Sequence, residues 1–417
     1  MFINSFHSGD VIYFRNLRDH LVVLNSAQAA NDLLEKQARV SSDRPFGNMM
    51  DKPYDETWRQ SRRAFHQNFR SEAMVKYEPV QMEKVHEFIR ALSLSPNPEQ
   101  LWSDISTFSQ GIMFSSIYGL NIVSKEILPK AARLAADQID WNLLPGNVSF
   151  KRLPFIHLVL SLMPNCQLSR HQKKIRETID QLRERPFKAA MEAWVCKSDS
   201  HPSMVGELMS KHIADGKSAQ EVESIKDMGA SALTMTATAS FFFAMSLYPD
   251  VQAKAREELD RVLGPGKIPR LSDRGSLPYI EAVYRELMRW HPTVPMGVPH
   301  QSTEDIIYKG YLIPKGATLS ANIWAMTHDP EQFPDPYRFI PERHLRDDGK
   351  FDNINSITAY GFGRRLCVGR YVADTTLWLV IACVLATTDI YRDDGLDKSE
   401  ALKGMDVEEY FTDGGLW

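Results

Sequence analysis

The residues of this chain that could do chemistry are concentrated in one short stretch near the carboxyl end. Cys367 stands there among Gly363, Arg365 and Gly369, just ahead of the apolar run Leu377–Ala386. Because a helix N-terminus and nearby arginines both favour the thiolate, such a cysteine could bind a soft metal. Glycines let the backbone turn sharply and approach a ligand closely. A structural cysteine in a turn before a core helix is the alternative, but it leaves the flanking arginines unexplained.

The composition is that of a globular chain and excludes several other classes of protein. The chain has 417 residues, of which 43% are hydrophobic and 24% are charged, and its formal net charge is −4. The net charge is slightly negative and the sequence has no basic stripe, so nucleic-acid binding is not predicted. The four cysteines lie far apart without a CxxC pair, which argues against a disulfide framework and against a structural zinc site. A reducing compartment is therefore expected.

The hydropathy pattern predicts no membrane span. No apolar run reaches the roughly 18 residues that cross a bilayer. The first residues, Met1–Ser5, lack a charged region followed by an apolar stretch, so no signal peptide is expected. From the sequence we therefore expect no transmembrane helix.

The periodicity of the chain predicts mainly α structure with small, segregated β-sheets. Val11–Phe14 and His20–Leu24 are short β-type runs that predict a hairpin in the β-rich stretch near 10–25, and further short strands are predicted near 303–321. Apolar residues at helical spacing dominate the remainder and predict helices that include Ala27–Gln37 and Pro278–Trp290. Gln220–Tyr248 is predicted to be one long helix. Because strands and helices do not alternate regularly, a doubly wound fold is not expected.

Four separated motifs resemble a single known family. In chain order they are Trp58-x-x-x-Arg62, Glu286-x-x-Arg289, Phe339-Ile340-Pro341-Glu342-Arg343 and Tyr360-x-x-Gly363-x-Arg365-x-Cys367-x-Gly369. Each short motif is weak alone, whereas the cysteine loop is fairly specific. All four, in this order and approximate spacing, closely resemble the cytochrome P-450 family, and the resemblance covers essentially the whole chain.

The resemblance implies the cytochrome P-450 fold as a single haem-thiolate domain over residues 1–417. The implied cofactor is haem b, with Cys367 as the axial thiolate ligand of the iron. Its propionates need compensation when buried, and arginine suits forked contact with carboxylates. The resemblance assigns the other haem contacts to Trp58, Arg62, His300, Tyr360, Gly363, Arg365 and Gly369. Of these, Arg365, Arg62, Trp58 and His300 are expected to donate to the propionates. The resemblance also implies a buried structural network of Glu286, Arg289 and Arg343.

The helix that activates oxygen in the family departs from the family pattern. Members carry Ala/Gly-Gly-x-Asp/Glu-Thr there, but no Asp or Glu occurs between Asp227 and Asp250. Aligning both flanks suggests that about six residues are missing, which would leave the two helix faces about 120° out of phase. Thr234 is the nearest remaining hydroxyl and is our candidate catalytic residue, although a threonine on a helix face more often serves packing. The acid–alcohol pair is therefore predicted to be missing, which would impair turnover.

Smaller departures concern the cysteine loop and the ends of the chain. Tyr360 replaces the usual Phe of the motif and adds a hydroxyl that needs a partner, and Val368 stands where Pro is frequent. We also expect the membrane anchor, the proline-rich hinge and the final strands of the family to be absent.

The leading hypothesis for function is a haem-thiolate monooxygenase. The resemblance implies electrons from NADPH through a flavoprotein reductase and insertion of one oxygen atom of O2 into an apolar small molecule. Segments such as Arg289-Trp290-His291-Pro292 resemble fungal members, many of which act in secondary metabolism or xenobiotic oxidation. The implied location is the cytoplasmic side of the endoplasmic reticulum, with peripheral membrane contact. Two alternatives stay open: a haem-thiolate isomerase or dehydratase that needs no O2 activation, and a catalytically impaired haem-binding pseudoenzyme.

Overall fold

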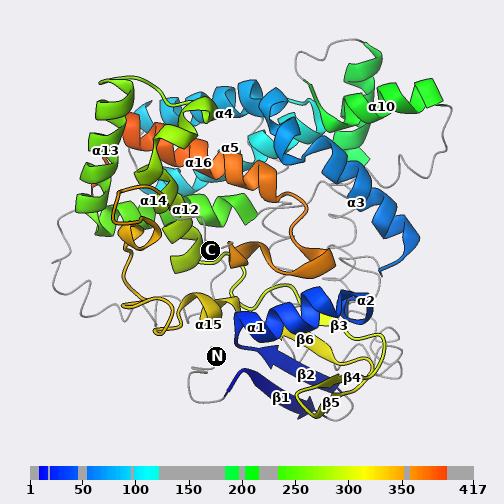
Figure 1. Ribbon diagram of the computed structural model, residues 1–417. Coiled ribbons are helices and arrows are strands. Elements are labelled where there is room, and N and C mark those ends of the chain that lie inside the picture. The colour runs from blue at the N-terminus through cyan, green and yellow to red at the C-terminus, as the bar shows by residue number, and fades with distance from the viewer. Residues whose placement is uncertain are drawn as a thin grey trace, which may run out of the picture.

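Two small β-sheets lie at one end of the molecule and most helices lie beyond them (Figure 1). The computed structural model describes residues 9–16, 19–45, 54–94, 98–121, 184–196, 202–215, 233–351 and 357–391. In the four-stranded sheet the order is β1 (Val11–Asn16), β2 (Asp19–Leu24), β6 (Thr318–Ala321) and β3 (His300–Gln301). The second sheet pairs β4 (Ile306–Tyr308) with β5 (Tyr311–Ile313). The prediction of a mainly α fold with small separate sheets is confirmed.

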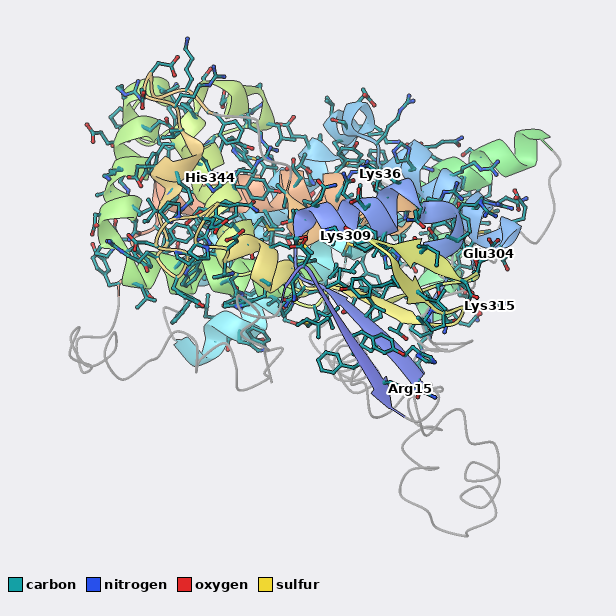
Figure 2. All side chains as sticks on the ribbon, turned by 60° about the horizontal axis from the view of Figure 1, so that its bottom comes forward. Arg15, Lys36, Glu304, Lys309, Lys315 and His344 are labelled. Carbon is teal, nitrogen blue, oxygen red and sulfur yellow. The ribbon has the colours of Figure 1, made fainter. Side chains whose placement is uncertain are left out.

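The larger sheet joins two parts of the chain that the sequence presents separately. The predicted hairpin is present, because β1 and β2 are antiparallel with Val11 opposite Leu24. In addition, β2 pairs in parallel with β6, with Leu21 opposite Thr318. Apolar side chains of both strands pack in one small hydrophobic cluster with the first helices. In Figure 2, Lys309 and Lys315 mark the region of β4 and β5, and His344 lies in the helical part.

The helices account for most of the described residues. Those named here are α1 (Ala27–Ala30), η2 (Asn31–Lys36), α2 (Ala38–Ser41), α3 (Glu56–Asn68), η3 (Ser71–Tyr77), α4 (Glu78–Leu94), α5 (Pro98–Tyr118), α10 (Met204–Asp215), α12 (Leu233–Leu247), α13 (Pro249–Leu263), η4 (Leu271–Ser276), α14 (Pro278–Trp290), α15 (Ile323–Thr327), η5 (Pro341–His344), η6 (Thr358–Tyr360), η7 (Gly363–Arg365) and α16 (Arg370–Thr387). The predicted long helix over 220–248 appears as α12, and its residues before 233 lie outside the described ranges.

Helix α16 is the centre of the large hydrophobic core. Its apolar run, predicted from Leu377–Ala386, packs against α4, α12, α13 and α14. Within the described ranges it is also the one helix long and apolar enough to cross a membrane, with a mean hydropathy of 1.3. Because 61% of it is buried inside the fold, we interpret it as a core helix.

Candidate functional site

The cysteine loop folds back on itself and places Cys367 at the start of α16. The backbone N–H of Cys367 donates to the carbonyl of Tyr360 over 2.9 Å, which closes the loop. Gly361 and Gly363 have φ angles of 84° and 62°, the left-handed region that glycine adopts without strain. Gly369 is the N-cap residue of α16. The predicted position of Cys367 at a helix entry is therefore present in the structure.

Gly363 has a structural role that the sequence did not reveal. A Cβ atom added there would lie 2.0 Å from the carbonyl oxygen of Leu34 in η2. The N–H of Gly363 also donates to the carboxylate of Glu35 over 2.7 Å. The glycine therefore lets the cysteine loop contact the backbone of η2, a π-helical stretch where the sequence predicted an ordinary helix.

Helix α3 brings two of the predicted haem contacts to the cysteine loop. Its N-cap Asp55 accepts a hydrogen bond from the backbone N–H of Trp58 over 2.8 Å, which fixes the first turn. Arg62 follows one turn later on the same face and donates to the carbonyl of Leu366. The guanidinium carbon of Arg365 lies 4.0 Å from the centre of the Trp58 ring, and that of Arg62 lies 5.3 Å from it. The structure thus brings Trp58, Arg62 and Arg365 together, as the motifs predicted.

Positive charge is concentrated around Cys367. Arg62 and Arg370 are both close enough to act electrostatically on the thiol. Within the described ranges, neither arginine forms an ion pair with a carboxylate. Burial lowers the pKa of Arg62, and the charge of Arg370 lowers it further. Such a cluster of cations is unfavourable by itself and becomes favourable with anions placed against it.

The state of Cys367 differs from the expectation that its surroundings favour the thiolate. Burial raises the pKa of the Cys367 thiol, and this outweighs the lowering by the Gly369 N–H, Arg62 and Arg370. The arginines and the helix end do act in the predicted direction, but they do not dominate. A metal that binds the sulfur must therefore displace a proton.

His300 lies on β3 near the same loop, but its hydrogen bonding restricts what it can donate. It is 5% exposed, and its Nδ1 lies 2.9 Å from the carbonyl of Ser41. Because a carbonyl only accepts, Nδ1 carries the proton, and neutral His300 has only an acceptor at Nε2. Burial lowers the pKa of His300 to about 3, and the charge of Arg44 contributes. Donation to a propionate, as predicted, would need the imidazolium form, which this burial opposes.

The extra hydroxyl of Tyr360 has a hydrogen-bond partner that the sequence analysis did not identify. It lies 3.0 Å from the hydroxyl of Tyr284 on α14. Burial is the main reason that the pKa values of both tyrosines are raised, so both hydroxyls stay protonated. Tyr284 lies two residues before Glu286 on the same helix. This nearness to the Glu286 motif is the only signal in the sequence that could have suggested Tyr284 as a partner of Tyr360.

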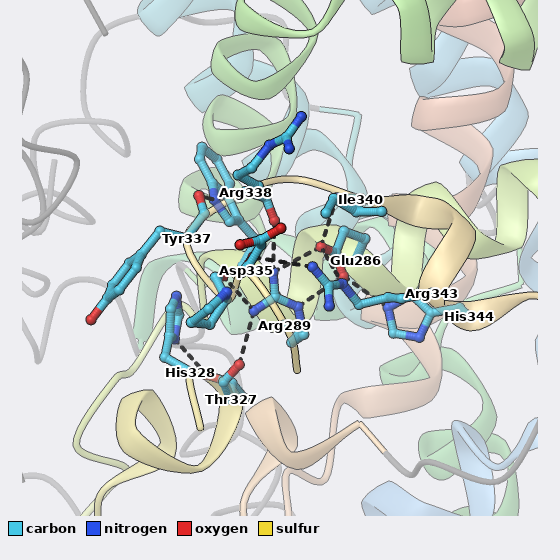
Figure 3. Close-up of polar contacts among 12 residues, drawn as sticks. Glu286, Arg289, Thr327, His328, Asp335, Tyr337, Arg338, Ile340, Arg343 and His344 are labelled. Carbon is cyan, nitrogen blue, oxygen red and sulfur yellow. Dashed lines mark hydrogen bonds and ion pairs between the residues drawn. The ribbon is translucent and has the colours of Figure 1, made fainter. Parts of the chain in front are cut away.

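The predicted network of Glu286, Arg289 and Arg343 is present and is larger than the motifs indicate (Figure 3). Glu286 is 0% exposed and accepts from Arg289 Nε and Nη2, both at 2.8 Å, and from Arg343 Nε at 3.2 Å. His344 Nε2 lies 2.9 Å from the other carboxylate oxygen, and the sequence analysis missed this residue. The N–H of Ile340 donates to Glu286 as well. The network joins α14 to η5, and its charged side chains are at most 11% exposed, which fits a structural role.

The pKa of Glu286 predicts a loss of stability in acid. Burial alone would raise this pKa, but the hydrogen bonds of Arg289 and His344 outweigh it and lower the value from 4.5 to about 2. The carboxylate therefore stabilises the fold above pH 4.5, and this contribution is lost as the pH falls toward 2. The shift corresponds to roughly 3 kcal/mol. Urea unfolding across this pH window should show the loss, and a free energy of unfolding that stays constant or rises on acidification would contradict it.

The helix predicted to activate oxygen, on the side of the haem opposite Cys367, is described only in part. Thr234 lies in the first turn of α12, and its side chain is outside the described set, as are residues 216–232. The prediction that the acid–alcohol pair is missing therefore stays a prediction. Farther along α12, Ser240 Oγ lies 2.5 Å from His291 Nδ1, which attaches this helix to the end of α14.

Comparison with known proteins identifies the family. The family model described as cytochrome P-450 matches residues 4–401. The chain belongs to the cytochrome P-450 family. It is 34% identical over 416 residues to cytochrome P-450 monooxygenase ple1 of Rhodocybe pseudopiperita, covering 93% of this chain and 77% of that protein. It is 32% identical over 417 residues to cytochrome P-450 monooxygenase COX2 of Coprinopsis cinerea, covering 94% and 78%.

A third relative has a more specific name. The chain is 34% identical over 382 residues to O-methylsterigmatocystin oxidoreductase of Aspergillus flavus, covering 87% of this chain and 72% of that protein. These relatives are fungal, and two are named monooxygenases. The predicted family and its fungal character are thus confirmed, and membership supports a haem-thiolate monooxygenase.

The residues on the proximal side fit the haem of this family. Cys367 would supply a sulfur ligand, and Arg62 with Arg370 places positive charge near it that no described carboxylate neutralises. An added Cβ at Gly369 would meet no heavy atom within 4 Å, so the backbone beside the cysteine is not covered by other protein atoms. A flat dianionic cofactor would match this combination of one thiol, open backbone and excess cations.

Proposed function

We propose that the protein is a haem-thiolate monooxygenase that inserts one oxygen atom of O2 into an apolar small molecule. The observation that carries the proposal is Cys367 at the entry of α16, within the electrostatic reach of Arg62 and Arg370. Haem b, when bound through the thiolate, supplies the activation of dioxygen. Electrons would come from NADPH through a flavoprotein reductase.

The residues of the chain have separate tasks in this proposal. Cys367 would hold the iron, while Arg62, Arg365 and Trp58 would bind and orient the propionates. Gly363 would hold the cysteine loop on η2, Gly369 would leave room beside the sulfur, and Tyr360 would line the loop. His300 would contribute only in its protonated form. Thr234 is the proposed hydroxyl for proton delivery on the opposite side.

The proposal is tested by replacing the residue that would bind the iron and recording the spectrum of the haem. Cys367→Ser should abolish the thiolate-type carbon monoxide difference spectrum of the reduced protein, because a serine hydroxyl is a poor substitute for a thiolate. Cys196→Ser, at an exposed cysteine outside the site, should keep it. A thiolate-type spectrum that survives in Cys367→Ser, or is absent from the wild-type protein reconstituted with haem, would overturn the assignment.

A second candidate function is haem-thiolate chemistry without O2 activation, such as isomerisation of a peroxide or dehydration. The observation that favours it is the absence of any Asp or Glu between Asp227 and Asp250 in the sequence. Turnover supported by a peroxide substrate but not by reductase and NADPH would support this candidate. Binding of haem with neither activity would indicate the catalytically impaired alternative.

The biological setting is proposed from the relatives. Fungal proteins with these names suggest secondary metabolism or xenobiotic oxidation for the present chain. A location on the cytoplasmic side of the endoplasmic reticulum, with peripheral membrane contact, would bring the protein close to a membrane-bound reductase. Cell fractionation with an antibody against this chain would test the location.

A further inference from the structure

A chain of polar side chains runs from the cysteine loop into the helical core. The Tyr360 hydroxyl lies 3.0 Å from the Tyr284 hydroxyl, and Tyr284 is 0% exposed. The carboxylate of Asp374 on α16 acts electrostatically on Tyr284 and, after burial and Tyr360, helps to raise its pKa. Arg274 holds this carboxylate through Nη1 at 2.5 Å and Nη2 at 3.1 Å. Either hydroxyl can be the donor, so Tyr360 and Tyr284 share one hydrogen bond.

The far end of this chain is fixed by several groups. Arg274 also donates to Glu281 from Nε over 2.8 Å, and Arg285 donates to the same carboxylate over 2.9 Å. The guanidinium of Arg274 lies over the rings of Tyr284 and Trp378, at 5.4 and 5.6 Å. The Tyr284 ring therefore packs against a guanidinium that carboxylates of α14 and α16 hold in place, and the Tyr284 hydroxyl offers Tyr360 a fixed partner.

The near end of the chain reaches Cys367 through the backbone. The carbonyl of Tyr360 accepts the N–H of Cys367 over 2.9 Å, so the position of Tyr360 restrains the position of the cysteine. The loop between them turns at Gly361 and Gly363, which supply little stiffness of their own. A Phe at position 360 would keep the ring contact but would lose the hydroxyl anchor.

We propose that Tyr360 is a positioning residue, whose hydroxyl bond to Tyr284 holds the cysteine loop so that Cys367 is in place to bind iron. The proposal rests on the proposed haem-thiolate function. It concerns a bond that the usual Phe of this motif cannot make.

The test compares three variants with the haem-loaded wild-type protein. Tyr360→Phe and Tyr284→Phe should each speed the loss of the thiolate-type carbon monoxide spectrum by about 2- to 10-fold, the size expected for one buried hydrogen bond. The double variant should lose it no faster than the faster single variant, because both changes remove the same bond. Additive effects, or an unchanged rate in Tyr360→Phe, would overturn the proposal.

A matched control separates positioning from a general loss of stability. Tyr279 lies on the same helix, is 8% exposed, and donates its hydroxyl to Glu342 over 3.0 Å, away from the cysteine loop. Tyr279→Phe should leave the rate of spectral loss within twofold of wild type. An acceleration equal to that of Tyr360→Phe would show that any buried tyrosine has this effect, and would contradict a specific role.

A second measurement keeps this proposal separate from the proposed function. If the wild-type protein never shows thiolate ligation, the proposed function fails, and alkylation by iodoacetamide in the haem-free protein decides the role of Tyr360. Tyr360→Phe should then change the alkylation rate of Cys367 by at least twofold and leave that of the exposed Cys196 unchanged. An unchanged rate at Cys367 would overturn the proposal.

Discussion

Glu286→Gln is expected to lower the free energy of unfolding by about 3–5 kcal/mol, and the variant should lose haem and solubility. The carboxylate is fully buried and compensates the charges of Arg289 and Arg343. Glutamine has a similar shape but no charge, so both guanidinium groups would stay charged without an anion between them. Arg343→Ala, which removes one of these cations, should also yield protein that is poorly soluble and poor in haem.

The check is urea unfolding together with the haem content of purified protein. Glu342→Gln is the matched control, because Glu342 is the neighbouring acid on η5 and forms a partly exposed ion pair with Lys254 over 2.5 Å. An exposed pair contributes at most about 1 kcal/mol, so this variant should stay close to wild type. A soluble, haem-loaded Glu286→Gln protein of wild-type stability would refute the structural role of the network.

Gly363→Ala is expected to cost roughly 2–5 kcal/mol and to release the cysteine loop from η2. The φ angle of 62° is unfavourable for alanine, and the new Cβ would lie 2.0 Å from the carbonyl oxygen of Leu34. That contact is with backbone, so no side chain can rotate to relieve it. The hydrogen bond from Gly363 N–H to Glu35 should be lost when the segments separate.

Thermal unfolding and the fraction of protein that binds haem would measure this effect. Gly275→Ala is the control, since this exposed glycine has no positive φ and no heavy atom within 4 Å of an added Cβ. It should change stability by no more than about 1 kcal/mol. Wild-type stability of Gly363→Ala would mean that η2 and the cysteine loop do not approach each other so closely.

The local sequence was sufficient to predict the main helices and strands, but not the contacts between segments that lie far apart in the chain. The hairpin of β1 and β2, the helix of the Glu286 motif and the core helix α16 were all predicted from periodicity and turn residues. The π-helical stretch at Asn31–Lys36, which contacts the cysteine loop through Glu35, was predicted only as an ordinary helix. Thr234 stays a sequence-based prediction.

The protonation of the site residues could not be predicted from the sequence and depended on the tertiary structure. The arginines near Cys367 predicted a thiolate, whereas burial raises the pKa of the thiol. Likewise, His300 was expected to donate, but the carbonyl of Ser41 determines which nitrogen carries its proton. Burial and carbonyl placement depend on packing between distant segments, and no local pattern reports them.

By itself, the sequence determined the candidate iron ligand and the family, because Cys367 and its neighbours form a contiguous motif whose residue types have a direct chemical meaning. Tertiary structure decided which distant side chains serve that motif. It brought the guanidinium carbon of Arg365 to 4.0 Å from the centre of the Trp58 ring. It also placed the Tyr360 hydroxyl within hydrogen-bond distance of Tyr284, and His344 within hydrogen-bond distance of Glu286. These contacts connect residues far apart in the chain, and only the packing of α3, α14 and α16 around a common core brings them together.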